Sequence, residues 1–240
     1  MPFPTVSIGG QVYLYDDFLG ASLNPAIAGT TENSGSAAIV VGQEGGVGGL
    51  VTGTTSGNRS AFTTGLNHLP SSGSIEVQWR AKPVTSVADV AYFYGLTDTV
   101  SLEFPIEISG TTITSNASNA VGIMFDTAAT TDAWRVVAVN GDTDSTPVIV
   151  TINGVNAAPT ADVYEQFRFE VTPEGDVSVS YGKESGDETV QGFQQVAFIA
   201  GAVSSSALLT PVAIVETRTT AAKTAYVDAL LIQSGRDGDL

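Results

Sequence analysis

The hydrophobic residues of this chain gather in short runs, and two of these runs are apolar almost throughout. Residues 90–96 (VAYFYGL) and 120–126 (AVGIMFD) are rich in Val, Ile, Phe and Tyr, and both end in acidic turns. Short runs of this composition, bounded by Gly, Thr and Asp, predict strands that are buried on both faces. Two such strands need a second sheet, about 10 Å away, to bury their side chains. The pair therefore predicts the middle of a β-sandwich that the rest of the chain covers.

Alternating runs predict strands that face the core on one side only. Residues 74–80 (SIEVQWR) set three apolar side chains against three polar ones, which makes them the clearest half-buried strand of the chain. Residues 164–171 (YEQFRFEV) alternate in the same way. A Pro/Gly turn at residues 172–176 joins them to residues 177–181 (VSVSY), so the two segments predict a β-hairpin.

Turn residues divide the rest of the chain into further short strands. Asn140-Gly141 predicts a hairpin, because both positions tolerate a positive φ. The glycines of residues 45–49 predict a tight turn, since no helix start follows that could hold a phosphate. Residues 191–200 fit either a helix or a strand, and residues 224–233 form the last strand, which we expect to close the sandwich. About a dozen short strands, with turn signals about every 8–12 residues, predict an all-β protein with an antiparallel β-sandwich or jelly roll.

The N-terminal residues depart from this pattern. Pro2 and Pro4 disfavour both helix and sheet interior. We therefore interpret residues 1–14 as an extended N-terminal arm and residues 15–240 as a single β-sandwich domain, a length that suits one large all-β domain. The arm is either a frayed terminus or a segment that lies on a neighbouring subunit and buries its apolar side chains there.

The charge balance restricts the partners of the chain. Its 25 acidic and 9 basic residues give a net charge of −16, which argues against nucleic acid and against an anionic membrane surface. The absence of cysteine excludes a disulfide framework and cysteine-ligated zinc, and one histidine cannot build a multi-histidine metal site. We find neither a signal peptide nor a run near the ~20 apolar residues of a membrane-spanning helix, so we expect synthesis in a cytoplasm.

Paired carboxylates are the first candidate for chemistry, because a glycosidase needs two of them about 5–10 Å apart. Glu103 and Glu107 are four positions apart and could share a strand face, but Pro105 lies between them. Glu165 and Glu170 are an odd number of positions apart and are expected to face opposite ways. We expect no cluster of aromatic side chains beside either pair, which disfavours hydrolysis of a sugar.

Two further candidates carry less weight. Asn140, Asp142 and Asp144 alternate as oxygen ligands of Ca²⁺ do, but the rest of an EF-hand loop does not follow, which favours an Asx-rich turn. His68 is the single imidazole base, and it is expected at the surface because it lies in a predicted loop and the chain has no G-x-S-x-G motif. The sequence therefore assigns no catalytic, cofactor-binding or metal-ligating residue, and we expect neither an enzyme nor a cofactor.

Several segments carry a family resemblance. The most specific are D-F-L-G at residues 17–20, V-G-I-M-F-D-T-A-A-T-T-D-A-W at residues 121–134, and a final V-D strand that ends in Gly-Arg at residues 227–236. With the strands around them, these segments resemble a group of structural proteins of tailed-bacteriophage virions, from residue 15 onward. Such proteins often have a Trp soon after D-F-L-G, where this chain has Asn24-Pro25-Ala26. The resemblance implies a virion component with a concanavalin A-like (lectin or laminin-G) β-sandwich and no enzymatic activity.

Three functions follow from this resemblance and from the residues. We favour a capsid decoration or cement protein that binds and stabilises the major capsid shell, because an acidic, soluble surface suits a protein present in many copies. Its partners would be the major capsid protein or other virion proteins, with a homo-oligomer on the outer surface of the capsid rather than on the tail, and neither nucleic acid nor membrane. The alternative is a lectin-like carbohydrate-binding module of a tail or head fibre involved in host attachment, and a glycoside hydrolase ranks last.

Overall fold

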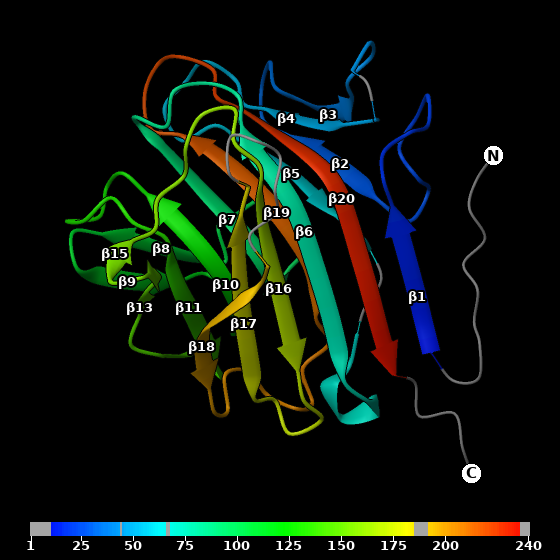
Figure 1. The fold of residues 1–240 in the computed structure, drawn as a ribbon, viewed down its shortest axis with the longest axis vertical. Helices are drawn as coiled ribbons and strands as arrows, with labels where there is room; N and C mark the ends of the chain where they lie inside the picture. The colour runs from blue at the N-terminus through cyan, green and yellow to red at the C-terminus, as the bar shows by residue number, and fades with distance from the viewer. Residues whose placement is uncertain (1–10, 44, 66–67, 185–191, 236–240) are drawn as a thin grey trace.

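The computed structural model describes residues 11–43, 45–65, 68–184 and 192–235. Its framework consists of two antiparallel sheets of eight strands each, which lie one over the other (Figure 1). In spatial order, the first sheet contains β18 (Gln194–Ile199), β17 (Val177–Lys183), β16 (Glu165–Val171), β6 (Ile75–Pro83), β20 (Thr224–Gly235), β4 (Gly48–Val51) and β3 (Ser36–Ile39), and β1 (Gln11–Asp16) pairs with β20. The second sheet contains β12 (Thr143–Asp144), β11 (Arg135–Asn140), β10 (Asn119–Asp126), β7 (Val90–Thr97), β19 (Thr210–Thr217), β5 (Arg59–Thr63) and β2 (Ala28–Thr31), and β13 (Val148–Ile149) pairs with β11.

Two small hairpins stand apart from these sheets. One consists of β8 (Ile106–Ser109) and β9 (Thr112–Ser115), and the other of β14 (Thr151–Ile152) and β15 (Val155–Asn156). The described residues contain one helical element, the 3-10 turn η1 (Pro70–Ser72). No helix within the described ranges has the length and apolar character to cross a membrane. The predicted all-β antiparallel sandwich is therefore confirmed.

The two apolar runs form the centre of the second sheet, as predicted. Strands β7 and β10 pair antiparallel, with Tyr94 opposite Ile123, and every residue of both strands is buried. Their inward side chains meet an aromatic cluster in which the Tyr94 and Phe167 rings stack 4.8 Å apart and Trp134 lies edge-on to Phe167 at 5.1 Å. Such pairs add about 0.5–1.5 kcal/mol each beyond the area they bury. The core of the sandwich is thus built around Trp134.

The outward faces of β7 and β10 are covered by a local segment and not by a third sheet. Phe104, Ile106 and Ile108, which lie before and within the β8–β9 hairpin, are buried against Phe93 and Met124 on the outer face of the second sheet. Figure 1 shows this hairpin beside β10 and β11. We call this second set of apolar side chains the outer layer. It explains why strands in a sandwich of two sheets are apolar on both faces.

The alternating runs occupy the first sheet in the predicted register. Strand β6 alternates buried and half-buried residues along its whole length, and β16 does the same. The hairpin of β16 and β17 is confirmed, with Phe167 opposite Tyr181. Residues 194–199, for which helix and strand were both open, form the strand β18 beside β17.

Three expectations need correction. Strand β20 lies inside the first sheet between β6 and the strands β4 and β1, so it does not close the sandwich at an edge. Residues 11–14 belong to β1 and pair with β20, so an arm could include only residues 1–10, which lie outside the described residues. The β11–β12 turn has its positive φ angles at Gly141 and Asp142, one position later than predicted.

Candidate functional site

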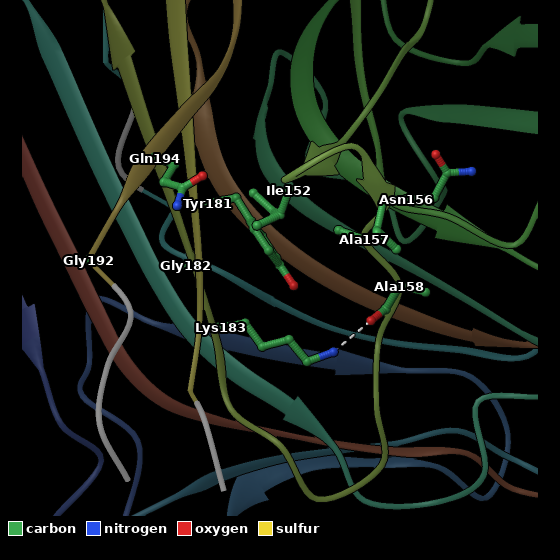
Figure 2. A pocket seen from close by; sticks show the side chains of 10 residues that line it. Ile152, Asn156, Ala157, Ala158, Tyr181, Gly182, Lys183, Gly192 and Gln194 are labelled. Atoms are coloured by element: carbon green, nitrogen blue, oxygen red, sulfur yellow. Dashed lines mark hydrogen bonds between the residues drawn. The ribbon is translucent and has the colours of Figure 1, made fainter. Parts of the chain in front are cut away.

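A pocket of about 320 Å³ opens beside the β14–β15 hairpin, against strands β17 and β18 (Figure 2). It lies at the side of the sandwich where β18 forms the edge of the first sheet. Ligand sites in proteins are concave, mostly apolar and equipped with a few fixed polar groups. The residues that line this pocket are Ile152, Val155, Asn156, Ala157, Ala158, Tyr181, Gly182, Lys183, Gly192 and Gln194.

The wall of the pocket is apolar and its rim is polar. Ile152, Ala157 and Ala158 pack against the core of the sandwich. The side-chain amides of Asn156 and Gln194 are exposed and make no hydrogen bond to another described residue. Each amide carries two N–H donors and one carbonyl acceptor. Neutral donors and acceptors beside an apolar wall suit a small ligand with hydroxyl groups on one side and C–H groups on the other.

Lys183 crosses the pocket between its two walls. Figure 2 shows its side chain extending from β17 toward Ala158. The Lys183 ammonium donates hydrogen bonds to the Ala158 carbonyl oxygen at 2.9 Å and to Thr160 Oγ1 at 2.7 Å. It is the one charged side chain among the described residues that line the pocket. Lys183 therefore ties β17 to the segment that follows β15 and puts a positive charge at the pocket wall.

A buried carboxylate lies behind this ammonium. Glu165 is 1% exposed and begins β16, where the strand's alternation turns it inward with Phe167. Tyr181 Oη donates to Glu165 Oε1 at 2.6 Å, and Trp134 Nε1 donates to both carboxylate oxygens at 3.2 and 3.3 Å. Lys183 Nζ lies 3.4 Å from Oε1. Three donors from two strands and a loop thus hold one carboxylate at the end of the core.

Burial decides the protonation of Glu165. Removal of the carboxylate from water raises its pKa to about 7, although Lys183, Tyr181 and Trp134 all favour the charged form. The same burial, together with the charge of Glu165, raises the pKa of the Tyr92 hydroxyl. Glu165 therefore changes charge close to neutral pH, directly behind the pocket.

This titration predicts a pH-dependent stability. The folded state binds the proton of Glu165 more tightly than the unfolded chain does, so Glu165 contributes stability below its unfolded pKa of about 4.5, and that contribution is lost as the pH rises through about 7. From pH 7 to pH 5 we expect the free energy of unfolding to increase by about 2 kcal/mol from this group alone. Urea denaturation of the wild type and of Glu165→Gln at both pH values isolates the contribution, and an identical pH dependence in the two proteins would contradict it.

The sequence analysis considered Glu165 but did not identify its surroundings. Glu165 and Glu170 do face opposite ways, as expected, and Glu170 forms an outward ion pair with Arg168. The expectation that no aromatic side chains lie beside Glu165 was wrong, since Trp134 and Tyr181 both donate to it. Position 165 holds a carboxylate in the apolar phase of an alternating strand. That mismatch was the available signal, although the partners come from distant strands.

Glu107 belongs to a second charged cluster, on the outer face of the second sheet. Arg218 forms two hydrogen bonds to Asp126 and one to Glu216, while Arg59 contacts Glu216 at 2.5 Å and Glu107 at 3.3 Å. Asp126 and Glu216 are 0% and 1% exposed. Because Glu107 lies on β8, the cluster also ties the β8–β9 hairpin to the sheet. Its charges are paired with one another, which is the arrangement of a structural network.

The remaining sequence candidates do not converge. Glu103 is exposed, whereas Glu107 points to Arg59. The side chains of the predicted Asx-rich turn diverge: Asn140 bonds to the Gly201 carbonyl, Asp142 to Ser118 and Asp144 to Ser115. Within the described ranges no group of three or more His, Cys, Asp or Glu side chains could hold a metal ion.

The expectation that His68 lies at the surface was wrong. Its side chain is 3% exposed, and its Nδ1 lies 2.8 Å from Ser234 Oγ of β20. An isolated bridge to Leu209 holds its backbone. The loop that carries His68 crosses the end of the sandwich, so the imidazole packs inside the protein.

Comparisons with known proteins agree with the fold. The sequence matches no protein-family model and no curated protein. A protein of unknown function from Shewanella oneidensis MR-1 has a similar structure, with a TM-score of 0.59, 16% identity, and coverage of 98% of this chain and 92% of that chain. Peanut lectin gives a TM-score of 0.59 at 11% identity and coverage of 93% and 97%. The carbohydrate recognition domain of Emp47p gives 0.56 at 9% identity and coverage of 93% and 95%.

These likenesses define the class of fold. The chain has the concanavalin A-like β-sandwich of the lectins, as the sequence predicted. The identities are all far below those that would carry a function from one protein to another. Nothing in the comparisons supports a phage origin.

Proposed function

We propose that this protein is a carbohydrate-binding module without catalytic activity, and that its sugar lies in the pocket beside the β14–β15 hairpin. The observation that carries the proposal is the pocket's composition, an apolar wall with the free neutral amides of Asn156 and Gln194 at its rim. A sugar presents both a C–H face and a set of hydroxyl groups, so it can meet both kinds of surface. The lectins and the carbohydrate recognition domain among the similar structures support the same class of ligand.

The size of the pocket suits a small part of a glycan. A volume of about 320 Å³ is at the lower end of the range for ligand pockets, about 300–1,000 Å³. One or two sugar units would fill it. A longer glycan would extend from the open side into solvent, as expected for a module that recognises the end of a chain.

The carboxylates support binding over hydrolysis. Glycosidases use two carboxyl groups about 5–10 Å apart on either side of the scissile bond. Glu165 is the carboxylate behind the pocket, it is 1% exposed, and its neighbour Glu170 lies on the opposite face of the sheet. A single shielded carboxylate can position a neighbouring donor but offers no second group for acid–base chemistry.

The rim amides give the direct test. We expect Gln194→Ala to weaken binding of a sugar about fivefold to tenfold, since one hydrogen bond contributes about 0.5–1.5 kcal/mol. A glycan array would select the sugar, and isothermal titration calorimetry would measure its affinity for wild type and variant. The matched control is Gln233→Ala, an exposed glutamine of β20 on the first sheet and outside the pocket. An array that stays silent at high protein concentration would refute the proposal.

Capsid decoration is the second candidate. One observation favours it: the outer face of the second sheet is sealed by the outer layer and by buried ion pairs, which suits a rigid building block. The comparisons give it no support. Quantification on purified particles separates the two functions, because a capsid protein should be present in hundreds of copies and a fibre module in far fewer.

A further inference from the structure

We propose that the pocket recognises a saccharide that carries a carboxylate, such as a uronic acid, and that Lys183 exchanges Glu165 for the ligand carboxylate when Glu165 takes up a proton. This inference rests on the proposed function and specifies the ligand and its regulation. It starts from the position of Lys183, whose ammonium crosses the pocket in Figure 2. In a chain with a net charge of −16, this ammonium is a point where an anionic ligand would be attracted.

The contacts of Lys183 show which of its partners a ligand could replace. Its hydrogen bonds to the Ala158 carbonyl and to Thr160 Oγ1, at 2.9 and 2.7 Å, are short. Its contact with the Glu165 carboxylate is longer, at 3.4 Å. Glu165 has its own donors in Tyr181 and Trp134, so the carboxyl group keeps hydrogen-bond partners when Lys183 turns away.

The charge of Glu165 decides how attractive the ammonium is. With Glu165 ionised, the pair behind the pocket is neutral overall. With Glu165 protonated, the pair carries one positive charge next to the pocket wall. The pKa of Glu165 is raised to about 7 by burial, so this change takes place near neutral pH.

The other groups around Glu165 do not compensate for this change. Tyr181 of β17 and Tyr92 and Tyr94 of β7 face it, and burial raises the pKa of all three hydroxyls, so they stay neutral throughout. Trp134 contributes an uncharged N–H donor. Lys183 is therefore the one group around Glu165 that responds to its ionisation with a change of partner.

The size of the effect follows from populations. Nearly all molecules carry protonated Glu165 at pH 5.5, and about one tenth do at pH 8. If the protonated form is the one that binds, the dissociation constant for an acidic sugar should rise about tenfold between these pH values. The sugar carboxylate stays ionised at both, as an α-carboxyl group does. A neutral sugar of the same size should show little change.

The test uses the full chain with galacturonic acid and galactose as probes, titrated by calorimetry at pH 5.5 and pH 8. We expect galacturonic acid to bind more tightly than galactose at pH 5.5, with most of that preference lost at pH 8. Lys183→Met should remove the preference at both pH values, and Glu165→Gln should keep it at both. Lys82→Met, which changes a cation of β6 outside the pocket, is the control and should behave as wild type.

The outcomes separate this inference from the proposed function. Equal binding of the two sugars at both pH values, weakened by Gln194→Ala, would overturn the inference and leave the proposed function intact. Tighter binding of galacturonic acid at pH 8 than at pH 5.5 would also overturn it. No binding of any sugar would overturn both. The wild-type comparison needs no variant, so it holds even if Glu165→Gln fails to fold.

Discussion

Replacing Arg218 with methionine should lower the free energy of unfolding by about 3–5 kcal/mol. Arg218 is the partner that Asp126 and Glu216 share, through two hydrogen bonds to Asp126 and one to Glu216. Both carboxylates are almost fully buried. Burial already raises the pKa of Glu216 against the opposing effect of Arg218 and Arg59. Without Arg218, Asp126 keeps the backbone N–H of Ala128 as a donor but loses its cation.

The measurement is urea denaturation followed by tryptophan fluorescence, since Trp79 and Trp134 are both in the core. Arg168→Met is the matched control. Arg168 pairs with Glu76 and Glu170 on the outer face of the first sheet, where all three side chains are partly solvated. Such a pair contributes about 0–1 kcal/mol. Equal losses in the two variants would show that the Asp126–Arg218–Glu216 network has no special role.

A second set of variants separates unpaired charge from lost packing. If the cost of Arg218→Met comes from the two carboxylates left behind, adding Asp126→Asn and Glu216→Gln should recover part of it. If the cost comes from the lost guanidinium contacts, the triple variant should be no more stable than the single one. Loss of one partner of a buried pair is usually costlier than replacement of the whole set, so we expect recovery.

The sequence predicted the sheets because their signal is local. An alternating strand such as β6 records, residue by residue, which side chains meet the core. The fully apolar β7 and β10 likewise recorded burial on both faces. The cover of the second face was not predicted. A second sheet accounts for one face only, and the outer layer comes from residues 104–108, a segment that contains Pro105 and only a short strand.

The candidate site was less accessible to sequence analysis, because its partners are distant along the chain. Glu165 becomes a site only when Trp134 and Tyr181 meet it, and those contacts join β16 to β17 and to the loop before β11. The same holds for Arg59 and Glu216, which are 157 positions apart. Periodicity predicts which way a side chain points but not what it meets. Only the odd phase of Glu165 was visible beforehand.

The backbone approach between β7 and β10 gives the second large prediction. Gly95 and Gly122 lie opposite each other on the outer face of the second sheet. A Cβ atom at Gly95 would lie 2.2 Å from the Val121 carbonyl oxygen and 2.6 Å from the Gly122 Cα. Both are backbone atoms in the central strand pair, so neither can move without breaking the ladder. We expect Gly95→Ala to cost about 3 kcal/mol, at the upper end for overpacked cores.

Gly122→Ala should be easier to accommodate, and the contrast makes the argument testable. Its Cβ would lie 2.4 Å from the tip of the Phe93 ring, which is a side chain that can be shortened, and 2.8 Å from the Tyr94 carbonyl oxygen. Phe93→Leu should therefore rescue part of the loss in Gly122→Ala but none of the loss in Gly95→Ala. Gly192→Ala, with open space around its Cβ, controls for the effect of alanine on the unfolded chain and should change stability by about 1 kcal/mol or less. Equal rescue of both variants by Phe93→Leu would mean that the two strands can separate, and that the outer layer and not the backbone sets their spacing.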